Sequence, residues 1–399
     1  MNIVFVSNYL NHHQIPFCEA VIRENGGDFT FIQMERMDET RVKMGWGIDV
    51  KDYDYAKCYY EEPDECRALM DNCDILIYGG VEDESYVKPR LKAGKIVVRY
   101  SERIYKEGQW RFISPRGLKK KYEDHVKYRK NPYYLLCAGA YVASDYRLIH
   151  AYPGKMYTWG YFPEFQEYDI NELMNRKNSD WGNVGEKKPV KLLYAGRMID
   201  WKHPEYAIEA AEALDRAGVK YELTMVGDGE LRSSLENKVR DKSLGGRVTF
   251  TGFMQPAEVR EKMLDSDIFL FTSDYMEGWG AVLNESMNCG CAVLASSGIG
   301  AVPSMLQHGS NGMVYRNGDI REFRRLVSEL AMDEKLRIKL GLNAYETIRT
   351  KWNAEIAATR FVRFARSLLS GNPESIDDGG PLSKAPVISP KRGYDYTRR

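Results

Sequence analysis

The chain has 399 residues, of which 43% are hydrophobic, and its 57 basic side chains balance 57 acidic ones. This length allows two or three domains that each bury a core, and the zero net charge argues against nucleic acid as a main partner, because neutralising phosphates normally requires a basic excess. No apolar run approaches the roughly 20 residues that span a bilayer as a helix.

The first apolar run, at 2–6, has neither a basic leader nor a small-residue cleavage site, so we expect a first strand and not a signal peptide. The seven cysteines are odd in number and scattered, and no pair of Cys-x-x-Cys motifs indicates zinc. We therefore expect free, buried thiols and a cytoplasmic protein.

The first half of the chain contains short apolar runs separated by polar or helical segments, which is typical of a buried parallel sheet. A strand is predicted at 2–7, and then a helix from Gln14 to about Glu24 that ends at Gly26-Gly27. Further apolar runs that we expect to be strands lie at 29–33, 74–78, 95–99 and 141–143.

The second half alternates strands and helices more clearly. A strand at 191–195 ends at Gly196, and a helix that begins near Pro204 has one apolar face and stops at Gly218. Further strands are expected at 219–225, 247–251, 267–272, 292–295 and 313–315. Such strand–helix–strand units in series predict right-handed crossovers and a parallel sheet covered on both faces.

The predicted fold class is therefore α/β, with two Rossmann-like, doubly wound parallel-sheet domains that face each other across a cleft. Residues from Gly371 onwards are rich in Gly and Pro and poor in apolar groups, which favours disorder. The predicted segments are an N-terminal domain at 1–165, a linker at 166–189, a second domain at 190–350, a helix at 351–370 that can pack back on the first domain, and a disordered tail at 371–399.

The loop after the strand at 191–195 contains Gly196, Arg197 and Lys202 and directly precedes a helix. An Arg and a Lys at one strand end can converge on a single dianionic group, the Arg as a planar fork and the Lys as a movable point charge. The alternative is that both are solvated surface cations.

A second loop combines carboxylates with glycines around an expected helix start: Glu277, Gly278, Trp279, Gly280, Ala281 and Glu285. The glycines let backbone amides approach a ligand, and the helix presents its N-terminus to phosphate. Glu285 lies about 8 Å along that helix. Two carboxylates that flank an anion site fit a nucleotide sugar, although Glu285 can also be an ordinary exposed helix carboxylate.

These motifs, Gly-Arg-x4-Lys, Val-Gly-Asp-Gly-Glu and Glu-x7-Glu followed by Cys-Gly, resemble the nucleotide-binding half of family 4 (group 1) glycosyltransferases over about residues 186–350. The resemblance implies the two-domain GT-B fold and retaining, metal-independent transfer from a nucleotide-diphosphate sugar, with no other cofactor. It also implies that Arg197 and Lys202 neutralise the leaving diphosphate and that Glu277 contacts the donor sugar. The amides of 278–281 would then bind phosphate, Glu285 the ribose, and the loop of Gly252, Phe253 and Met254 the base.

The N-terminal half departs from the pattern of this family. The loop after the first strand lacks the usual glycines, and Ser101 and Glu102 stand after the strand where many members carry a sugar-contacting His. His12 and His13 are further candidates for contact with the donor sugar or the acceptor, or they are simply polar residues at a helix entry.

Other enzyme classes find less support. Asp52-Tyr53-Asp54 spells the Asp-x-Asp of metal-dependent transferases but follows no clear strand, and no Gly-x-Gly-x-x-Gly follows the first strand as a dinucleotide fingerprint requires. A GT-B epimerase, a phosphorylase or a non-catalytic nucleotide-sugar-binding protein stays open. Release of nucleoside diphosphate only in the presence of an acceptor distinguishes a transferase from these.

The acceptor is expected in the N-terminal half, as a saccharide or a lipid-linked saccharide used in the synthesis of a polysaccharide or glycoconjugate. Residues 116–130 hold seven cations against two anions, and Trp110, Phe112 and Ile113 precede them. Basic and aromatic side chains of this kind favour peripheral contact with an anionic inner membrane face. The alternative is a solvated basic helix.

Overall fold

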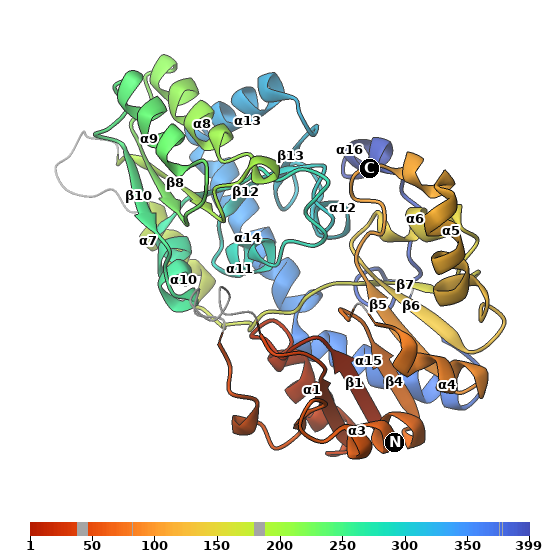
Figure 1. The fold of residues 1–399 in the computed structure, drawn as a ribbon. Helices are drawn as coiled ribbons and strands as arrows, with labels where there is room; N and C mark the ends of the chain where they lie inside the picture. The colour runs from red at the N-terminus through yellow and green to blue at the C-terminus, as the bar shows by residue number, and fades with distance from the viewer. Residues whose placement is uncertain (38–46, 82, 179–187, 375, 377) are drawn as a thin grey trace. The chain divides into compact units, whose positions relative to one another are not determined.

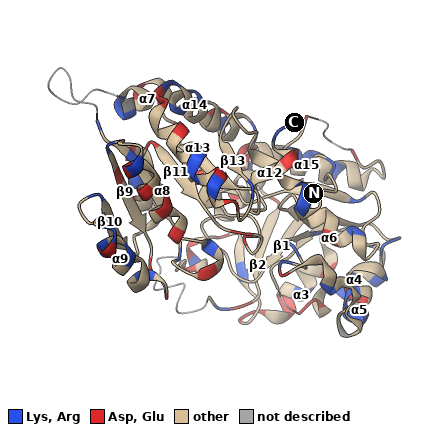
Figure 2. Ribbon diagram, turned by 90° about the horizontal axis from the view of Figure 1, so that it is seen from above, with Lys and Arg blue, Asp and Glu red and all other residues tan. Residues whose placement is uncertain are grey.

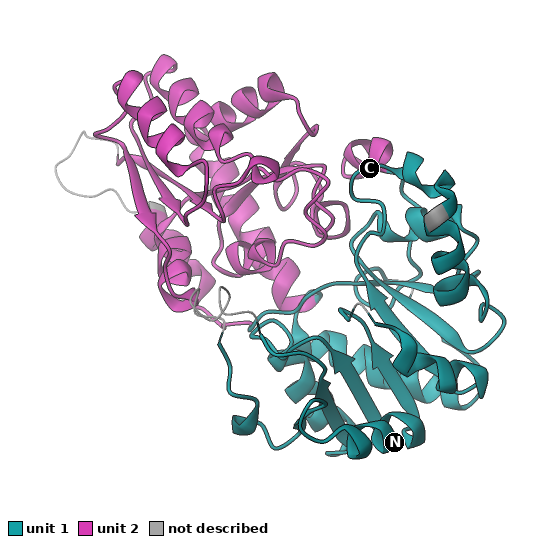
Figure 3. Cartoon of the chain, in the orientation of Figure 1, with its two compact units in different colours: residues 1–164, 351–389 teal, residues 165–350, 390–399 magenta. Residues whose placement is uncertain are grey.

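The computed structural model describes residues 1–37, 47–81, 83–178, 188–374, 376 and 378–399. The chain forms two compact units, coloured separately in Figure 3. Unit 1 comprises Met1–Glu164 and Lys351–Ser389, and unit 2 comprises Phe165–Thr350 and Pro390–Arg399. The backbone therefore passes from one unit to the other at 164/165, at 350/351 and at 389/390.

Unit 1 is built on a sheet of seven parallel strands in the order β3-β2-β1-β4-β5-β6-β7. The strands are β1 (Ile3–Ser7), β2 (Phe29–Gln33), β3 (Ala56–Cys58), β4 (Ile75–Tyr78), β5 (Val97–Ser101), β6 (Tyr133–Ala138) and β7 (Met156–Trp159). Every residue of β1, β4 and β6 is buried, as expected for strands covered on both faces.

Helices surround this sheet. They are α1 (Ile15–Asn25), α3 (Pro63–Asn72), α4 (Lys88–Lys92), α5 (Pro115–Lys121), α6 (Val142–Leu148) and α15 (Ala354–Leu369), with the short turns η2 (Val50–Asp52), η3 (Ser85–Val87), η4 (Gln109–Ile113) and η5 (Tyr122–Val126). Although α15 is distant in sequence, it packs along α1 (Figure 1), and the rings of Phe17 and Phe361 lie 5.9 Å apart. The C-terminal helix therefore completes the core of the unit in which the chain begins.

Unit 2 contains a sheet of six parallel strands in the order β10-β9-β8-β11-β12-β13. The strands are β8 (Val190–Ala195), β9 (Tyr221–Val226), β10 (Val248–Gly252), β11 (Ile268–Phe271), β12 (Ala292–Ser296) and β13 (Met313–Tyr315). The helices and short turns of this unit are α7 (Ile170–Asn178), η6 (Asp200–Lys202), α8 (Glu205–Arg216), α9 (Arg232–Asp241), α10 (Pro256–Asp265), α11 (Val282–Asn288), α12 (Val302–Met305), α13 (Ile320–Met332), α14 (Glu334–Thr350), η7 (Pro390–Arg392) and α16 (Gly393–Tyr396).

Charged side chains gather on the helices (Figure 2), where α8 and α9 carry both signs, whereas β1 and β2 contain no charged residue. The α/β class predicted from the sequence, with two doubly wound parallel sheets, is confirmed. All seven cysteines are free and buried, as expected. Within the described residues, no helix combines the length and the apolar character that crossing a bilayer requires.

Three local expectations differ from the structure. The apolar run at 141–143 is the start of α6 and not a strand, because Gly139, with φ of 126°, turns the chain after β6. Within the expected linker at 166–189, residues 170–178 form α7, whose buried Lys177 donates through Nζ to the carbonyl oxygen of Ser266 over 2.6 Å. Residues 179–187 of that linker lie outside the described residues.

The third difference concerns the C-terminal residues 371–399, for which we expected disorder. Residues 375 and 377 lie outside the described part, but Leu382 is buried and Ser383 accepts a hydrogen bond from the backbone N–H of Thr158 in β7 over 2.8 Å. Because β7 is an edge strand, this segment satisfies backbone groups that would otherwise be exposed. Farther on, Arg398 donates to Glu322 in unit 2.

Candidate active site

The loops that follow β8 and β11 carry the three residues predicted to be catalytic. Arg197 and Lys202 come after β8, and Glu277 comes after β11. These strands are neighbours, and the strand order reverses between them, since β9 and β10 lie beyond β8 while β12 and β13 lie beyond β11. A doubly wound sheet binds its ligands at this switch point, outside the carboxyl ends of the strands.

Lys202 and Glu277 are in direct contact. Nζ of Lys202 lies 2.7 Å from Oε2 of Glu277, and the side chains are only 16% and 12% exposed. Ser273 Oγ donates to the same carboxylate oxygen over 2.9 Å, and Thr272 Oγ1 donates to the main-chain oxygen of Lys202 over 2.7 Å. The two loops are thus joined by an ion pair and by a backbone contact, which fixes both reactive groups at the switch point.

Arg197 is held less tightly. Its side chain is exposed, and its Cζ lies 5.8 Å from the ring centroid of Trp201, while Nζ of Lys202 lies 4.9 Å from the same ring. Arg197 makes no ion pair with any residue in the described part of the chain. The two cations therefore share one indole, and the guanidinium of Arg197 is available to an anionic ligand.

His203, which directly follows Lys202, strengthens the link between the same loops. Its Nδ1 lies 2.9 Å from Glu205 Oε1, and its Nε2 lies 3.6 Å from Asp274 Oδ2 in the loop after β11. Hydrogen bonding to Asp274 and Glu205 raises the pKa of His203 to about 10, so the imidazole is protonated at neutral pH. A third fixed positive charge therefore stands beside Lys202.

Glycines let the loops after β8 and β9 approach each other. A Cβ added to Gly227, whose φ is 119°, would lie 2.1 Å from the carbonyl oxygen of Gly196, and one added to Gly229 would lie 2.5 Å from that of Met198. Met198 N–H donates to the Asp228 carbonyl over 2.8 Å. The Val-Gly-Asp-Gly-Glu motif thus positions the Gly196 loop by close backbone contact.

The loop after β11 offers backbone donors. The N–H groups of Gly278, Gly280 and Ala281 donate to no residue in the described ranges, although Gly278 and Ala281 are buried. Buried amides without a partner are rare and costly, so such donors indicate a place for an anionic ligand. Trp279 is fully buried and donates from Nε1 to Asn284 Oδ1 over 3.0 Å, which anchors the loop to α11.

The remaining residues expected to bind the donor also lie in unit 2. Gly252 is buried at the end of β10, with φ of 77°, and its carbonyl accepts from Gly227 N–H over 2.8 Å. Phe253, which follows it, is 56% exposed, and Met254 is half-buried. Glu285 is half-buried in α11, beyond the loop that carries the unpartnered amides.

The candidate residues of unit 1 also lie at the carboxyl edge of its sheet. His12 and His13 lie in the loop after β1 with ring centroids 3.9 Å apart, next to the switch point between β1 and β4. Ser101, the last residue of β5, has its Oγ 2.9 Å from the hydroxyl oxygen of Tyr146. Glu102 accepts from Tyr161 and Lys106, so its carboxylate is already engaged within the unit.

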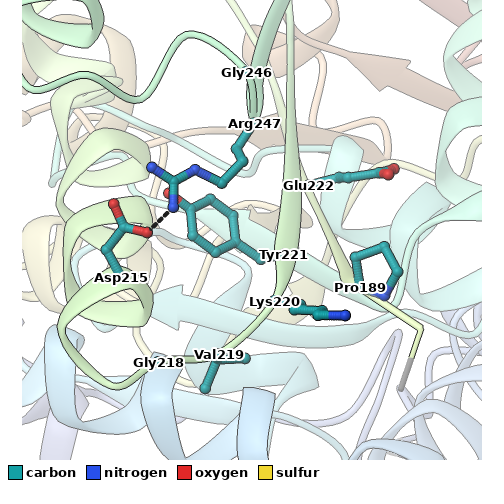
Figure 4. Close-up of a pocket in the computed structure, with 9 residues that line it drawn as sticks. All are labelled: Pro189, Asp215, Gly218, Val219, Lys220, Tyr221, Glu222, Gly246 and Arg247. Carbon is teal, nitrogen blue, oxygen red and sulfur yellow. Dashed lines mark hydrogen bonds and ion pairs between the residues drawn. The ribbon is translucent and has the colours of Figure 1, made fainter. Parts of the chain in front are cut away.

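Two other features lie at the opposite, amino ends of strands. Asp52 and Asp54 are exposed and precede β3, which separates them from the carboxyl edge where ligands bind. A pocket of about 420 Å³ (Figure 4) is lined by residues before or at the start of β8, β9 and β10. There Arg247 forms an ion pair with Asp215 and lies over the ring of Tyr221. This pocket is remote from Lys202 and Glu277.

The sequence did not single out Thr272, Ser273, Asp274 or His203 as residues of the site. Their position in the sequence was the feature that could have indicated them, since the first three end or follow a predicted strand and His203 follows Lys202. His203 also adopts φ of 48°, a left-handed conformation that is uncommon for a residue other than glycine.

Residues 175–347 match the family model described as Glycosyl transferases group 1. The amylovoran biosynthesis glycosyltransferase AmsK of Erwinia amylovora is 29% identical over 175 residues, which is 43% of this chain and 43% of that protein. The alpha-D-kanosaminyltransferase of Streptomyces kanamyceticus is 28% identical over 183 residues, 46% of this chain and 47% of that protein. The chain thus matches less than half the length of these curated relatives.

Solved structures show the same fold over most of the chain. HepE of Anabaena in complex with UDP superposes with a TM-score of 0.66 at 15% identity, covering 93% of this chain and 100% of that one. The lipopolysaccharide outer core galactosyltransferase WaaB gives 0.63 at 17% identity, covering 93% and 100%. Two parallel α/β units arranged in sequence as in these proteins establish the GT-B fold. Residues 175–347, which lie in unit 2, are therefore similar to the group 1 glycosyl transferases.

Proposed function

We propose that this protein transfers a sugar from a nucleotide-diphosphate sugar to a saccharide or lipid-linked acceptor, in the synthesis of a cell-surface polysaccharide or glycoconjugate. The observation that carries the proposal is the set of groups at the switch point of unit 2. The amides of Gly278, Gly280 and Ala281, which donate to no described residue, follow β11, and two cations follow the neighbouring β8. A diphosphate is the ligand chemistry that satisfies both.

In this proposal the side chains of Arg197 and Lys202 lower the barrier to the chemical step. The barrier to sugar transfer lies in separating an oxocarbenium-like sugar from an anionic diphosphate, and fixed positive charge lowers it. Arg197 and Lys202 supply that charge, with protonated His203 behind them. We propose that these side chains replace a divalent metal ion, so that transfer requires no metal.

The ion pair between Lys202 and Glu277 bears on donor binding, because Nζ of Lys202 lies 2.7 Å from Oε2 of Glu277. A diphosphate competes for the same ammonium, so its arrival weakens this contact and leaves the carboxylate free to accept from a sugar hydroxyl. Donor binding and sugar positioning are thereby linked.

The other residues place the rest of the donor. Gly196 brings the backbone close to the phosphates, Glu285 binds the ribose hydroxyls, and Gly252, Phe253 and Met254 face the base. HepE was solved with UDP and with UDP-glucose, which makes uridine nucleotides the first to try. We propose retention of anomeric configuration, with acceptor contacts from His12, His13, Ser101 and Glu102, and action at the cytoplasmic face of a membrane.

Calorimetry with nucleoside diphosphates, followed by assays of diphosphate release with each matching sugar nucleotide, tests the function. Release is expected to depend on added saccharide or lipid extract, and NMR of the product is expected to show the donor's anomeric configuration. Lys202→Met and Arg197→Ala should each lower turnover about 30- to 1000-fold, equivalent to about 2–4 kcal/mol in the barrier.

Arg216→Ala is the matched control, because this exposed cation lies at the far end of α8 and pairs with Glu212. Its turnover should equal that of the unmodified protein. Acceptor-independent conversion of the donor would identify an epimerase, phosphate-dependent cleavage a phosphorylase, and tight binding without turnover a binding protein. Each of these results would overturn the proposal.

A further inference from the structure

Exposed apolar side chains gather on the segment of unit 1 that contains η4, α5 and η5. Over the described residues, the large hydrophobic side chains that are exposed number eight, and four of them fall between 110 and 122. These four, named here the apolar rim, are Trp110, Ile113, Leu118 and Tyr122, which are 68%, 64%, 43% and 53% exposed. Such clustering within thirteen residues marks a binding surface, because scattered exposed apolar side chains are normal and contiguous ones are not.

The rim is formed by two adjoining helical segments. Trp110 and Ile113 lie three residues apart in η4, where positions i and i+3 share a face. Leu118 and Tyr122 lie four residues apart along α5 and the start of η5. Because η4 and α5 are in contact, the two pairs lie on adjoining segments of unit 1.

Hydrogen bonds and core contacts hold the segment that carries the apolar rim against the rest of unit 1. Gln109 donates to Ser144 and to Asp145, and buried Asp145 also accepts from Arg103 and from the backbone N–H of Tyr105. On the same segments Phe112 and Val126 pack against the hydrophobic core of unit 1. The apolar rim is therefore exposed on a rigid support that already has its own core contacts.

Cations border the rim, and several of them are neutralised by ion pairs within unit 1. Arg111 pairs with Glu107, Lys120 with Asp124, and Lys127 with Glu123. Lys119 and Lys121 lie next to Leu118 and Tyr122 and form no ion pair with a described residue, although Lys121 also lies 4.9 Å from the ring of Tyr105. Apolar side chains therefore dominate this surface, and a smaller positive charge surrounds them.

We propose that the apolar rim inserts into the interface of an anionic lipid bilayer, with Trp110 and Tyr122 at the level of the headgroups and Lys119 and Lys121 against lipid phosphates. Tryptophan, tyrosine and lysine around aliphatic side chains are the composition of membrane-interface anchors. The positive border complements an anionic leaflet. This proposal rests on the action at a membrane that is proposed above, and it names the surface and the side chains that bind.

Flotation with vesicles of phosphatidylcholine containing phosphatidylglycerol tests the proposal on the full chain. The protein is expected to float with these vesicles at low salt and much less with pure phosphatidylcholine. Trp110→Ser/Ile113→Ser should weaken partitioning about tenfold at any salt concentration, because it removes inserted apolar area. Lys119→Gln/Lys121→Gln should weaken it mainly at low salt and flatten its salt dependence.

Two control variants make the same kinds of substitution at exposed positions outside the rim. Met332→Ser removes an apolar side chain that is 63% exposed in unit 2, and Lys51→Gln/Lys335→Gln removes two exposed cations. Both should float like the unmodified protein, and thermal unfolding should show that all variants are folded. Lys202→Met should float normally, which separates this test from that of the transferase activity.

Failure to float with anionic vesicles, or equal flotation of the Trp110→Ser/Ile113→Ser variant, would overturn the proposal. Self-association through the rim without vesicle binding, detected as a change in sedimentation that the same double substitution abolishes, would assign the surface to a second copy of this chain and equally overturn it.

Discussion

At the scale of single residues, the contact between Lys202 and Glu277 places opposite charges where the proposed reaction needs both of them separately. The pair is largely buried, and Ser273 donates to the same carboxylate oxygen that Lys202 contacts. A buried carboxylate that loses its cation must find another partner, which in the proposed mechanism is a sugar hydroxyl. Binding of the diphosphate and catalysis should therefore respond differently when the carboxylate is changed.

Glu277→Gln is expected to keep or improve affinity for the nucleoside diphosphate while lowering turnover about tenfold or more. The amide competes less well for Lys202, but it is a weaker acceptor for the sugar. Calorimetry with the diphosphate and steady-state kinetics with the sugar nucleotide measure the two effects. Parallel losses in affinity and turnover would show that Glu277 only supports the fold of the loop.

His203 leads to a prediction about pH. Its pKa rises from the ordinary 6.5 to about 10 through Asp274 and Glu205. The stabilisation is therefore complete below pH 6.5, declines as the pH rises, and is lost above pH 10, because only the folded state holds the proton in between. The Tm difference between the unmodified protein and His203→Asn should shrink over this range. Asn tolerates the left-handed backbone, and a Tm difference that widens with pH would contradict this charge assignment.

Sequence patterns indicated which residues stand at strand ends, and Arg197, Lys202 and Glu277 do follow β8 and β11. They could not indicate the ion pair, because the adjacency of β8 and β11 depends on strand order and their residues are 75 positions apart. Asp274 was missed for the same reason, since its partner His203 lies on the other loop. Roles in binding and catalysis stay predictions for all of these residues.

At the scale of elements, the strands of the second half were well predicted because apolar residues, in a run or in alternation with polar ones, lie between turn residues. In the first half β6 and β7 were missed, since tyrosines and a tryptophan make up much of these strands and weaken the aliphatic pattern. The short edge strand β3 contains only three residues. Packing within the completed sheet determines whether such segments form strands more than their local composition does.

The close approach of the loops after β8 and β9 predicts a severe effect of Gly227→Ala. The added Cβ would meet the Gly196 carbonyl at 2.1 Å, and φ of 119° is itself unfavourable for alanine. We expect a loss of about 2–5 kcal/mol in the free energy of unfolding, together with weaker diphosphate binding. Gly218→Ala is the comparison, because it has a similarly positive φ of 65° but open space around it, and it should cost about 1 kcal/mol. Equal costs would exclude the steric explanation.

The position of Asp52 and Asp54 before β3 predicts the outcome of metal removal. Transfer should survive EDTA at full rate, and Asp52→Asn/Asp54→Asn should be fully active, because both carboxylates lie at the amino end of an edge strand. Initial rates of diphosphate release before and after chelation measure this. Loss of activity that manganese or magnesium restores would reinstate the two aspartates as metal ligands.

At the scale of the whole molecule, neither unit is a continuous stretch of sequence. Unit 1 needs α15, where Phe361 meets Phe17 and Trp159, and it needs residues 382–385 beside β7. Unit 2 in turn includes Pro390–Arg399, which contact Glu322 and His308. The helix at 351–370 was expected to pack back on the first domain, but the expected tail from 371 did not reveal the contacts of 382–399 with both units, because such contacts leave no local sequence pattern.

A chain that ends at residue 350 should therefore lose amide protection in β1, β6 and β7, while β8–β13 keep theirs. A chain that ends at residue 389 should keep unit 1 intact and lose protection only around 308–322. Hydrogen exchange followed by mass spectrometry compares the three lengths. Full protection of β1 in the chain that ends at 350 would show that α15 is dispensable for unit 1.

The contact between α1 and α15 also has a consequence for biosynthesis. The ribosome makes α1 well before α15, which follows the whole β8–β13 sheet, so unit 1 stays incomplete until the sheet of unit 2 has been synthesised. Until then Phe17 of α1 has its contacts with Trp159 and Phe162 but lacks the one with Phe361. Nascent chains that end between about residues 165 and 350 should therefore be the ones that chaperones retain.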